Sequence, residues 1–345
     1  MLRTHALSLA TVAMGLCAAA PAIAGTFTYS TVAPSGLMSV GATGMTADGR
    51  VVGYYYDSQG NGGAYVFANG ILTLVTGQKK PLVEFLNVNA SGRALAEYAD
   101  SKHEARICRS KLNGAHCVQV KLPHQNSIGE NSVNASGAIA GTLYDYANNP
   151  SLTTTAFIAS GRQAVELFPP NSFESTATGI NDSGVVIGTS FVANQPAQAY
   201  TYQNGTFNLF SWPGNGPASY GTIISNTGAV GGYSEYVGTI TNYAVIGGLT
   251  AQIAVPGAVD TYLINFGPAD EVVGNWDLSM YTVNTHGFIY AGGAYHTIDV
   301  PRMAGTLVGG VNINGDLFGI ASTTGDTYDT IFAATCAPKD RPCTK

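Results

Sequence analysis

Apolar and polar positions alternate along this chain in short runs that tight turns interrupt. The runs are rich in Val, Ile, Thr, Tyr and Phe and alternate with a period of two, which predicts β-strands rather than helices. One ten-residue phrase, clearest at 179–188 (GINDSGVVIG), occurs seven times, with its last position at residues 53, 96, 141, 188, 232, 274 and 319. Intervals of 42 to 47 residues between the copies predict a repeat protein of the propeller type.

Each repeat divides into four strands. In the fourth repeat, the first strand is expected at 175–180, and the turn Asn181–Gly184 leads into the second. A longer loop precedes the third strand at 199–202, and the turn Asn204–Gly205 leads to the fourth. The first turn ends in Gly, which adopts positive φ freely, except in repeat six, where Asp270 takes that place. Four strands per repeat are typical of a propeller blade.

The two ends of the chain predict a closed ring. The seventh repeat has a third strand at 331–334 but no fourth, and residues 26–34 have the pattern of the missing strand. Pairing the two segments would remove both sheet edges, which otherwise invite aggregation. The expected architecture is an all-β, seven-bladed β-propeller over residues 25–336, with about 44 residues per blade and a C-terminal tail at 337–345.

The first 24 residues have the features of a secretory signal peptide. Arg3 supplies a positive charge, residues 6–20 are apolar, and residues 22–24 (AIA) form a small-residue cleavage site. The apolar stretch is too short for a membrane anchor, and Leu16 before Cys17 disfavours lipidation. No other segment is apolar enough to span a membrane. The mature chain is expected to be secreted or periplasmic.

The charge balance argues against nucleic acid as a partner. The chain has 15 Lys and Arg, one of them Arg3 in the signal peptide, against 21 Asp and Glu. Proteins that bind nucleic acid need a basic surface that displaces counterions. Few charges together with 43 Gly are typical of extracellular β-proteins, and 45% hydrophobic residues are enough for a large core.

Four cysteines follow the signal peptide, and an even number in an exported chain favours disulfides. Cys108 and Cys117 flank a turn at 113–114 and are expected to face each other on adjacent strands. Cys336 and Cys343 would close a loop in the tail. Zinc is the alternative, but the spacing is poor for zinc and no pair of histidines matches it.

Three phrases carry a family resemblance: GINDSG at 179–184, HGFIY at 286–290 and HTIDVP at 296–301. They resemble the HAF-type extracellular repeat of bacterial secreted proteins, most clearly in repeats one, four, six and seven. Only repeat six keeps the His before the third-strand aromatic residue, His286. The resemblance implies a repeat protein exported by a bacterium and no established activity.

The connections between second and third strands vary most, and loops of this kind carry function on rigid scaffolds. They are predicted at 57–63, 100–104, 145–155, 192–198, 235–242, 277–285 and 323–329. In most of them an aromatic residue lies near an acid. The predicted binding residues are Tyr55, Asp57, Tyr98, Asp100, Tyr144, Asp145, Glu235, Tyr236, Trp276, Asp277, Asp326 and Asp329.

These residue types suit a neutral or cationic glycan, because aromatic rings stack on sugar faces and carboxylates accept hydrogen bonds from hydroxyl groups. The alternative is structural: each Tyr packs between blades with its hydroxyl group in water. Calcium is a second alternative, since the segment 312–316 (NINGD) offers oxygen ligands. A calcium site needs about six to eight oxygens, however, and this segment matches the hairpin turns of the other repeats. No other cofactor or metal is indicated.

No catalytic motif stands out, because the chain lacks G-x-S-x-G, H-E-x-x-H and a phosphate-binding loop. The candidates for acid–base chemistry in the loops are His103 and His286, with Lys102 and Arg106 nearby. Three hypotheses remain: a binding module for a glycan or another extracellular polymer, a polysaccharide-active lyase or hydrolase on the same face, and a scaffold for a protein partner.

Overall fold

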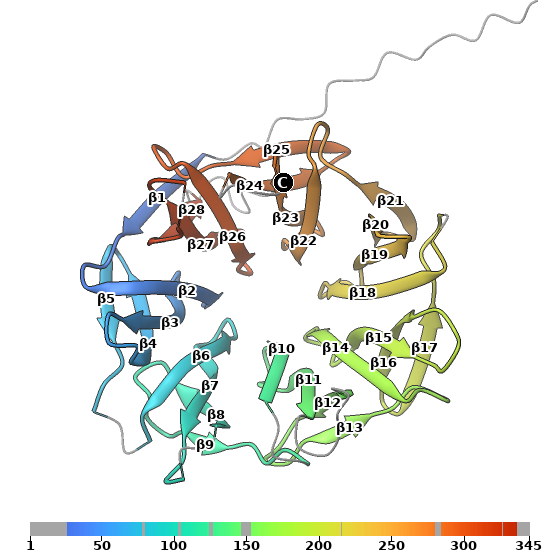
Figure 1. The fold of residues 1–345 in the computed structure, drawn as a ribbon, viewed down its shortest axis with the longest axis horizontal. Coiled ribbons are helices and arrows are strands. Elements are labelled where there is room, and N and C mark those ends of the chain that lie inside the picture. Colours follow the sequence, from blue (N-terminus) through green and yellow to red (C-terminus); the bar gives the residue numbers. More distant parts are fainter. Residues whose placement is uncertain are drawn as a thin grey trace, which may run out of the picture.

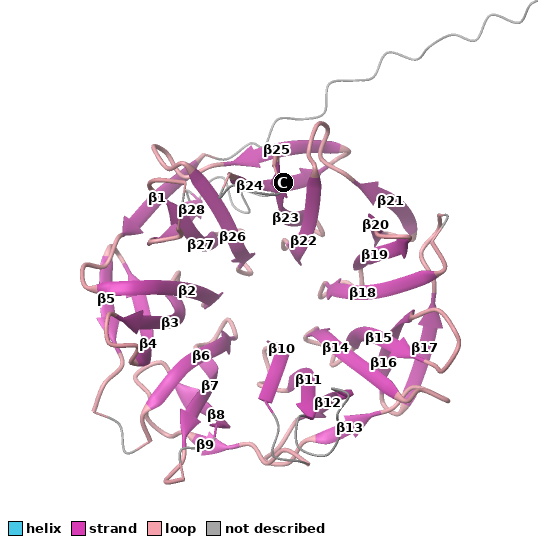
Figure 2. Ribbon diagram, in the orientation of Figure 1, coloured by secondary structure: helices cyan, strands magenta, loops and turns pink. Residues whose placement is uncertain are grey.

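The computed structural model is a ring of seven four-stranded antiparallel sheets around a central axis, as Figure 1 shows. It describes residues 26–77, 80–102, 105–123, 127–145, 153–214, 216–279, 284–325 and 327–336. This part of the chain consists of strands, turns and loops (Figure 2), and it holds no helix that could cross a membrane. The chain is therefore an all-β, seven-bladed β-propeller, which confirms the architecture predicted from the repeats.

Each blade is built from four strands that run from the central axis outward. Blades one to three contain β2 (Leu37–Met45), β3 (Val51–Asp57), β4 (Gly62–Ala68) and β5 (Ile71–Leu74); β6 (Leu82–Val88), β7 (Arg93–Ala99), β8 (Ala105–Lys111) and β9 (Val118–Gln119); and β10 (Ser127–Val133), β11 (Ile139–Asp145), β12 (Thr153–Ala159) and β13 (Val165–Leu167). Blades four to six contain β14 (Glu174–Ile180), β15 (Val186–Phe191), β16 (Gln198–Gln203) and β17 (Thr206–Phe210); β18 (Ala218–Ile224), β19 (Val230–Tyr236), β20 (Thr239–Ile246) and β21 (Leu249–Ile253); and β22 (Asp260–Phe266), β23 (Val272–Asp277), β24 (Thr285–Ala291) and β25 (Ala294–Ile298). Blade seven contains β26 (Gly305–Val311), β27 (Leu317–Ser322), β28 (Thr330–Cys336) and β1 (Phe27–Val32).

The N-terminal strand closes the ring. β1 pairs antiparallel with β28, from Phe27 opposite Cys336 to Val32 opposite Ile331. It thereby becomes the outer strand of blade seven, next to β28 in Figure 1. The predicted closure is confirmed, and both ends of the propeller's chain are held within one sheet.

The Gly that ends the ten-residue phrase is required by the third strand of its blade. Tyr200 on β16 crosses Gly188 on β15, and its hydroxyl group donates to the Thr176 carbonyl on β14 at 2.8 Å. A Cβ at position 188 would lie 1.9 Å from that oxygen, so a side chain does not fit there. Tyr65 donates in the same way across Gly53. The recurring combination of Gly and an aromatic residue therefore fixes the inner three strands of a blade.

The Asn that opens the turn binds both its own turn and the next blade. Asn181 Oδ1 accepts the Val185 amide at 2.9 Å, and its Nδ2 donates to the Ser225 carbonyl of blade five at 3.0 Å. The same two contacts are made by three further buried residues: Asn89, Asn134 and Asn312. Each of these side chains therefore ties its blade to the following one.

The hydrophobic core lies between the faces of neighbouring blades. Phe85 of blade two packs in one cluster with Val52 of blade one, and Phe332 of blade seven packs with Val273 of blade six. Contacts of this kind are not directional, so the angle between blades depends on the hydrogen bonds at the turns.

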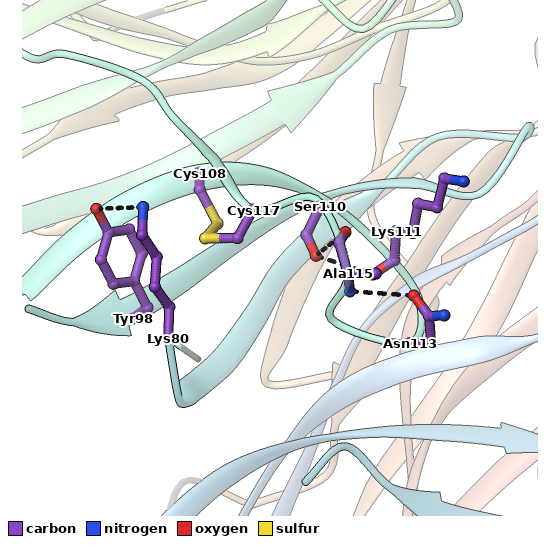
Figure 3. The surroundings of a disulfide bond; sticks show 8 residues. All are labelled: Lys80, Tyr98, Cys108, Ser110, Lys111, Asn113, Ala115 and Cys117. Carbon is purple, nitrogen blue, oxygen red and sulfur yellow. Dashed lines mark hydrogen bonds between the residues drawn. A yellow bond between two sulfur atoms is a disulfide. The ribbon is translucent and has the colours of Figure 1, made fainter. Parts of the chain in front are cut away.

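One predicted disulfide is present in blade two, shown in Figure 3. Cys108 and Cys117 are bonded with their Cα atoms 5.3 Å apart. Their register is offset, since Cys108 pairs with Gln119 and Cys117 precedes β9. Cys336 is also disulfide-bonded, and its predicted partner Cys343 lies outside the described residues.

The long loop predicted at 235–242 in blade five is wrong. β19 continues to Tyr236 and β20 begins at Thr239, so a turn of two residues, Val237 and Gly238, joins them. Both residues have positive φ, 48° and 77°. A two-residue hairpin turn of type I′ requires positive φ at both of its central residues. A β-branched residue such as Val rarely adopts positive φ, so the residues at 237–238 did not indicate a tight turn.

Replacing Asn181 by Ser should separate its two roles. Ser225 closes the turn of blade five through its hydroxyl group, so a serine introduced at position 181 can close the turn but cannot reach blade five. The buried Ser225 carbonyl then keeps only the Gly228 amide as a donor, and N181S should lower the free energy of unfolding by about 1 kcal/mol. N181A, which also loses the turn contact, should lower it further. Urea unfolding of residues 25–345 measures both, and equal stability of N181S and wild type would contradict the role of the amide.

Candidate functional site

The predicted binding residues lie at or near one face of the ring, which we call the loop face. It is formed by the connections between second and third strands and by the crossovers between blades; the opposite side is the turn face. The second strands β3, β7, β11, β19 and β23 carry most of the predicted residues at or near their ends. These residues are spread over six blades rather than gathered in one place. Asp326 and the side chain of Asp145 lie outside the described residues.

Several predicted aromatic rings are used for packing. Tyr98 is 3% exposed and lies under Lys80, whose Nζ is 4.4 Å from the ring centroid; Figure 3 shows the pair. The Tyr144 ring fills the space that a Cβ of Gly129 would need. Trp276 stacks on His286 with centroids 4.5 Å apart. Tyr236, by contrast, is 54% exposed.

Most of the predicted carboxylates are held by their neighbours. The Asn61 side chain and nearby backbone amides hold the pKa of Asp57 below its usual value. Asp100 forms an ion pair with Arg106 at 3.2 Å. Asp329 accepts hydrogen bonds from two threonines, and Glu235 is hydrogen-bonded to Tyr220. These acids therefore stabilise local structure.

A different arrangement occurs at the loop end of blade six, where Asp260, Tyr262 and Asp277 form what we call the blade-six cluster. Asp260 on β22 lies opposite Asp277 on β23 in register. Tyr262, two residues further on, is hydrogen-bonded to Asp260 and is 47% exposed. Burial, followed by the charges of Asp260 and Asp277, raises the pKa of Tyr262. Asp277 Oδ1 is buried and has no hydrogen-bond partner among the described residues.

A groove of about 390 Å³ lies between blades five and six. The side chains of the blade-six cluster point away from it, toward blade seven, because Asp277 alternates with Asn275 on β23 and Asn275 is hydrogen-bonded to Val308 of blade seven. One wall comes from β20 and the end of β21, including Ile240, and the other from the residues that lead into β22, including Val259. Both side chains are more than half exposed. Asn242 Nδ2 donates to the Thr261 carbonyl at 2.7 Å and so joins the walls. The sequence analysis predicted Asp277 but missed Asp260 and Tyr262, whose signal is an acid and a Tyr that open a first strand.

His286 forms the other notable contact in blade six. Its Nδ1 lies 2.8 Å from Asp299 Oδ1, and a carboxylate at this position orients the imidazole. The charge of Asp299 also acts on Tyr29 of β1. Burial, with a smaller contribution from this charge, raises the pKa of Tyr29 to about 12. The pair is a candidate acid–base group in the outer half of the blade.

The turn face has a cavity of about 570 Å³ at the central axis. All seven inner strands line it, and each has a register shift against its second strand. The segment 312–316, considered for calcium, belongs to this face. Asn312 Oδ1 accepts the Asp316 amide and Asp316 Oδ1 accepts the Cys336 amide. Within the described ranges, no three His, Cys, Asp or Glu side chains are grouped to hold a metal ion.

A second pair of carboxylates lies in blade two. Glu84 on β6 is opposite Glu97 on β7 in register. Burial, and then the Glu97 charge, raises the pKa of Glu84 to about 7, and burial raises the pKa of Glu97. At mildly acidic pH the pair therefore retains a proton that two exposed carboxylates would release.

This pair should make stability depend on pH. The folded state holds the proton of Glu84 up to a pH of about 7, whereas the unfolded chain loses it near the ordinary pKa of 4.5. The folded state binds more protons in this window, so stability should fall as the pH rises through it. E84Q should remove most of this slope. Urea midpoints at a pH of about 5 and about 8 measure it, and equal slopes in wild type and E84Q would contradict the assignment.

No known protein family matches the chain, and no curated protein matches it in sequence. Solved structures do match. The β-propeller domain of the Trilobed protease from Pyrococcus furiosus is 11% identical over 87% of this chain and 94% of its own, with a TM-score of 0.60. That domain has an open velcro topology, whereas β1 closes the ring here.

Two further structures place enzymes among the proteins of similar fold. Pyrococcus horikoshii acylaminoacyl peptidase is 10% identical, with a TM-score of 0.61; the match covers 92% of this chain and 54% of that one, so the chain spans about half of the peptidase. A catalytically inactive virginiamycin B lyase from Staphylococcus aureus, in complex with quinupristin, is 12% identical over 90% of this chain and 99% of its own, with a TM-score of 0.53. These likenesses establish the β-propeller fold.

Proposed function

We propose that this protein is an extracellular binding module that holds a glycan on the loop face of blade six, on the side toward blade seven. The observation that supports this most directly is the Tyr262 ring, which is exposed beside two carboxylates at the loop end of that blade. The Cys108–Cys117 disulfide supports the predicted export, because disulfides persist in oxidising compartments.

The chemistry of the blade-six cluster suits a sugar chain. The exposed face of Tyr262 can stack on the apolar face of a sugar ring, while Asp260 and Asp277 can accept hydrogen bonds from its hydroxyl groups.

The other predicted residues extend this proposal along the face. Glu235 and Tyr236 lie on β19, next to the β20 wall of the groove. Tyr55, Tyr98 and Tyr144, with their acids, belong to blades one to three. Their contact with a long polymer stays a prediction.

Polysaccharide cleavage is the second candidate, and the contact between His286 and Asp299 favours it. A lyase needs a base, which this pair would supply, and a group that neutralises the acid of a uronic sugar. Residues 163–301 contain no Lys or Arg, so blade six offers no cation for that purpose. Binding is therefore the better supported function.

Size-exclusion chromatography of residues 25–345 with fluorescent bacterial, plant and chitin-like polysaccharides tests the proposal. At least one polymer should co-elute with its length unchanged. Y262A should weaken that binding at least about tenfold, which corresponds to about 1.4 kcal/mol. F173A is the matched control, because Phe173 is also an exposed ring and lies in the crossover that leads into blade four, away from the blade-six cluster.

Three results would contradict the proposal. They are the absence of co-elution with any polymer, wild-type binding by Y262A, and equal losses in Y262A and F173A. Shortened chains would favour the enzyme instead, and H286A should then abolish the shortening.

A further inference from the structure

We infer that the glycan carries amino groups, and that the blade-six cluster holds one of them as an ammonium ion between Asp260 and Asp277. The inference rests on the proposed function and specifies its ligand class. Four observations support it: the register of the two acids, the unpaired Asp277 oxygen, the adjoining exposed ring, and the distribution of charge over the ring.

The register brings two negative charges together. Residues directly opposite each other on antiparallel strands have Cβ atoms about 5 Å apart, and like charges in this position destabilise a sheet. Asp260 and Asp277 are such a pair. Neither makes an ion pair with any residue in the described ranges. A bound cation would turn this repulsion into attraction.

The hydrogen bonds indicate which kind of cation. Asp277 Oδ1 is buried without a partner among the described residues, while Asp260 already has Tyr262 as a partner. Buried carboxylate oxygens are normally hydrogen-bonded, and a missing donor requires an explanation. An ammonium group brings three donors, enough to serve both carboxylates. Attached to a sugar, it would bring the sugar ring beside Tyr262.

Charge is distributed unevenly around the propeller. From residue 163 to residue 301, a segment that includes all of blades four, five and six, the chain contains no Lys or Arg. The acids in that segment are Glu166, Glu174, Asp182, Glu235, Asp260, Asp270, Glu271, Asp277 and Asp299. A surface of one sign attracts ligands of the opposite sign and raises their rate of association. It repels anionic polymers such as uronic-acid glycans.

Calcium is less suitable than ammonium at this place. Calcium takes about six to eight oxygen ligands and is usually held by several carboxylates. The described residues contain no group of three or more His, Cys, Asp or Glu with such an arrangement. Two carboxylates beside an exposed aromatic ring suit a compact organic cation better.

The test compares glucosamine oligosaccharides with N-acetylglucosamine oligosaccharides of equal length, which differ in charge. Isothermal titration of residues 25–345 at low salt should give at least about tenfold tighter binding of the amine form. The advantage should shrink as the salt concentration rises. D260N and D277N should each reduce this advantage to about twofold or less. D270N is the control, because Asp270 belongs to the same blade but to the turn face and should leave the advantage intact.

The outcomes are distinguishable. Equal binding of the two glycans, or an amine advantage that survives in both D260N and D277N, overturns the ammonium pairing and leaves glycan binding in place. Binding that a chelator abolishes and calcium restores overturns it in favour of a metal. Binding of neither glycan, while a Lys- and Leu-rich peptide binds, overturns both proposals and favours a protein partner. Thermal unfolding of each variant shows whether it is folded.

Discussion

Holding seven sheets at fixed angles around one axis is the constraint on which the rest of the molecule depends. Apolar contacts between blades fill space but do not define an angle. The amides of Asn89, Asn134, Asn181 and Asn312 define it, because each donates from one turn to a carbonyl of the next. The loss of one such hydrogen bond would cost about 1 kcal/mol, because each of these carbonyls still accepts an amide of its own turn. The ten-residue phrase recurs because several junctions need the same pair of hydrogen bonds.

Blade six satisfies this constraint in a different way. Its turn, 267–270, has no Asn, and the link to blade seven comes from Asn275 on the second strand. Asn275 Nδ2 donates to the Val308 carbonyl at 2.9 Å and its Oδ1 accepts the Val308 amide at 2.8 Å. Residues two apart on a strand point to the same side, so Asn275 and Asp277 share one side of β23. The strand that carries the unpaired acid is thus anchored two residues before it.

The sequence predicted the architecture because its signals are local and repeated. Position 188 needs Gly because Tyr200 crosses it, and Asn181 recurs because it joins blade four to blade five. The third strand at 331–334, which has no fourth strand after it, indicated the closure by β1. The sequence does not show, however, which Tyr side chains are exposed to solvent. Tyr98 is covered by Lys80, which comes from the crossover between blades one and two, whereas Tyr262 is about half exposed. Alternation along a strand does not show what a crossover covers, so the sequence did not distinguish the covered ring from the open one.

The acids of the loop face differ in their hydrogen-bond and ion-pair partners, and the proposed function rests on this difference. Asp57, Asp100 and Asp329 each have donors from their own loop or strand, so their charges are accounted for by local structure. Asp277 has an unpaired buried oxygen and faces another acid, an arrangement that lowers stability. Proteins retain such arrangements mainly where function requires them. Blades four to six contain no Lys or Arg, and this is why we propose that a ligand supplies the compensating charge for the pair.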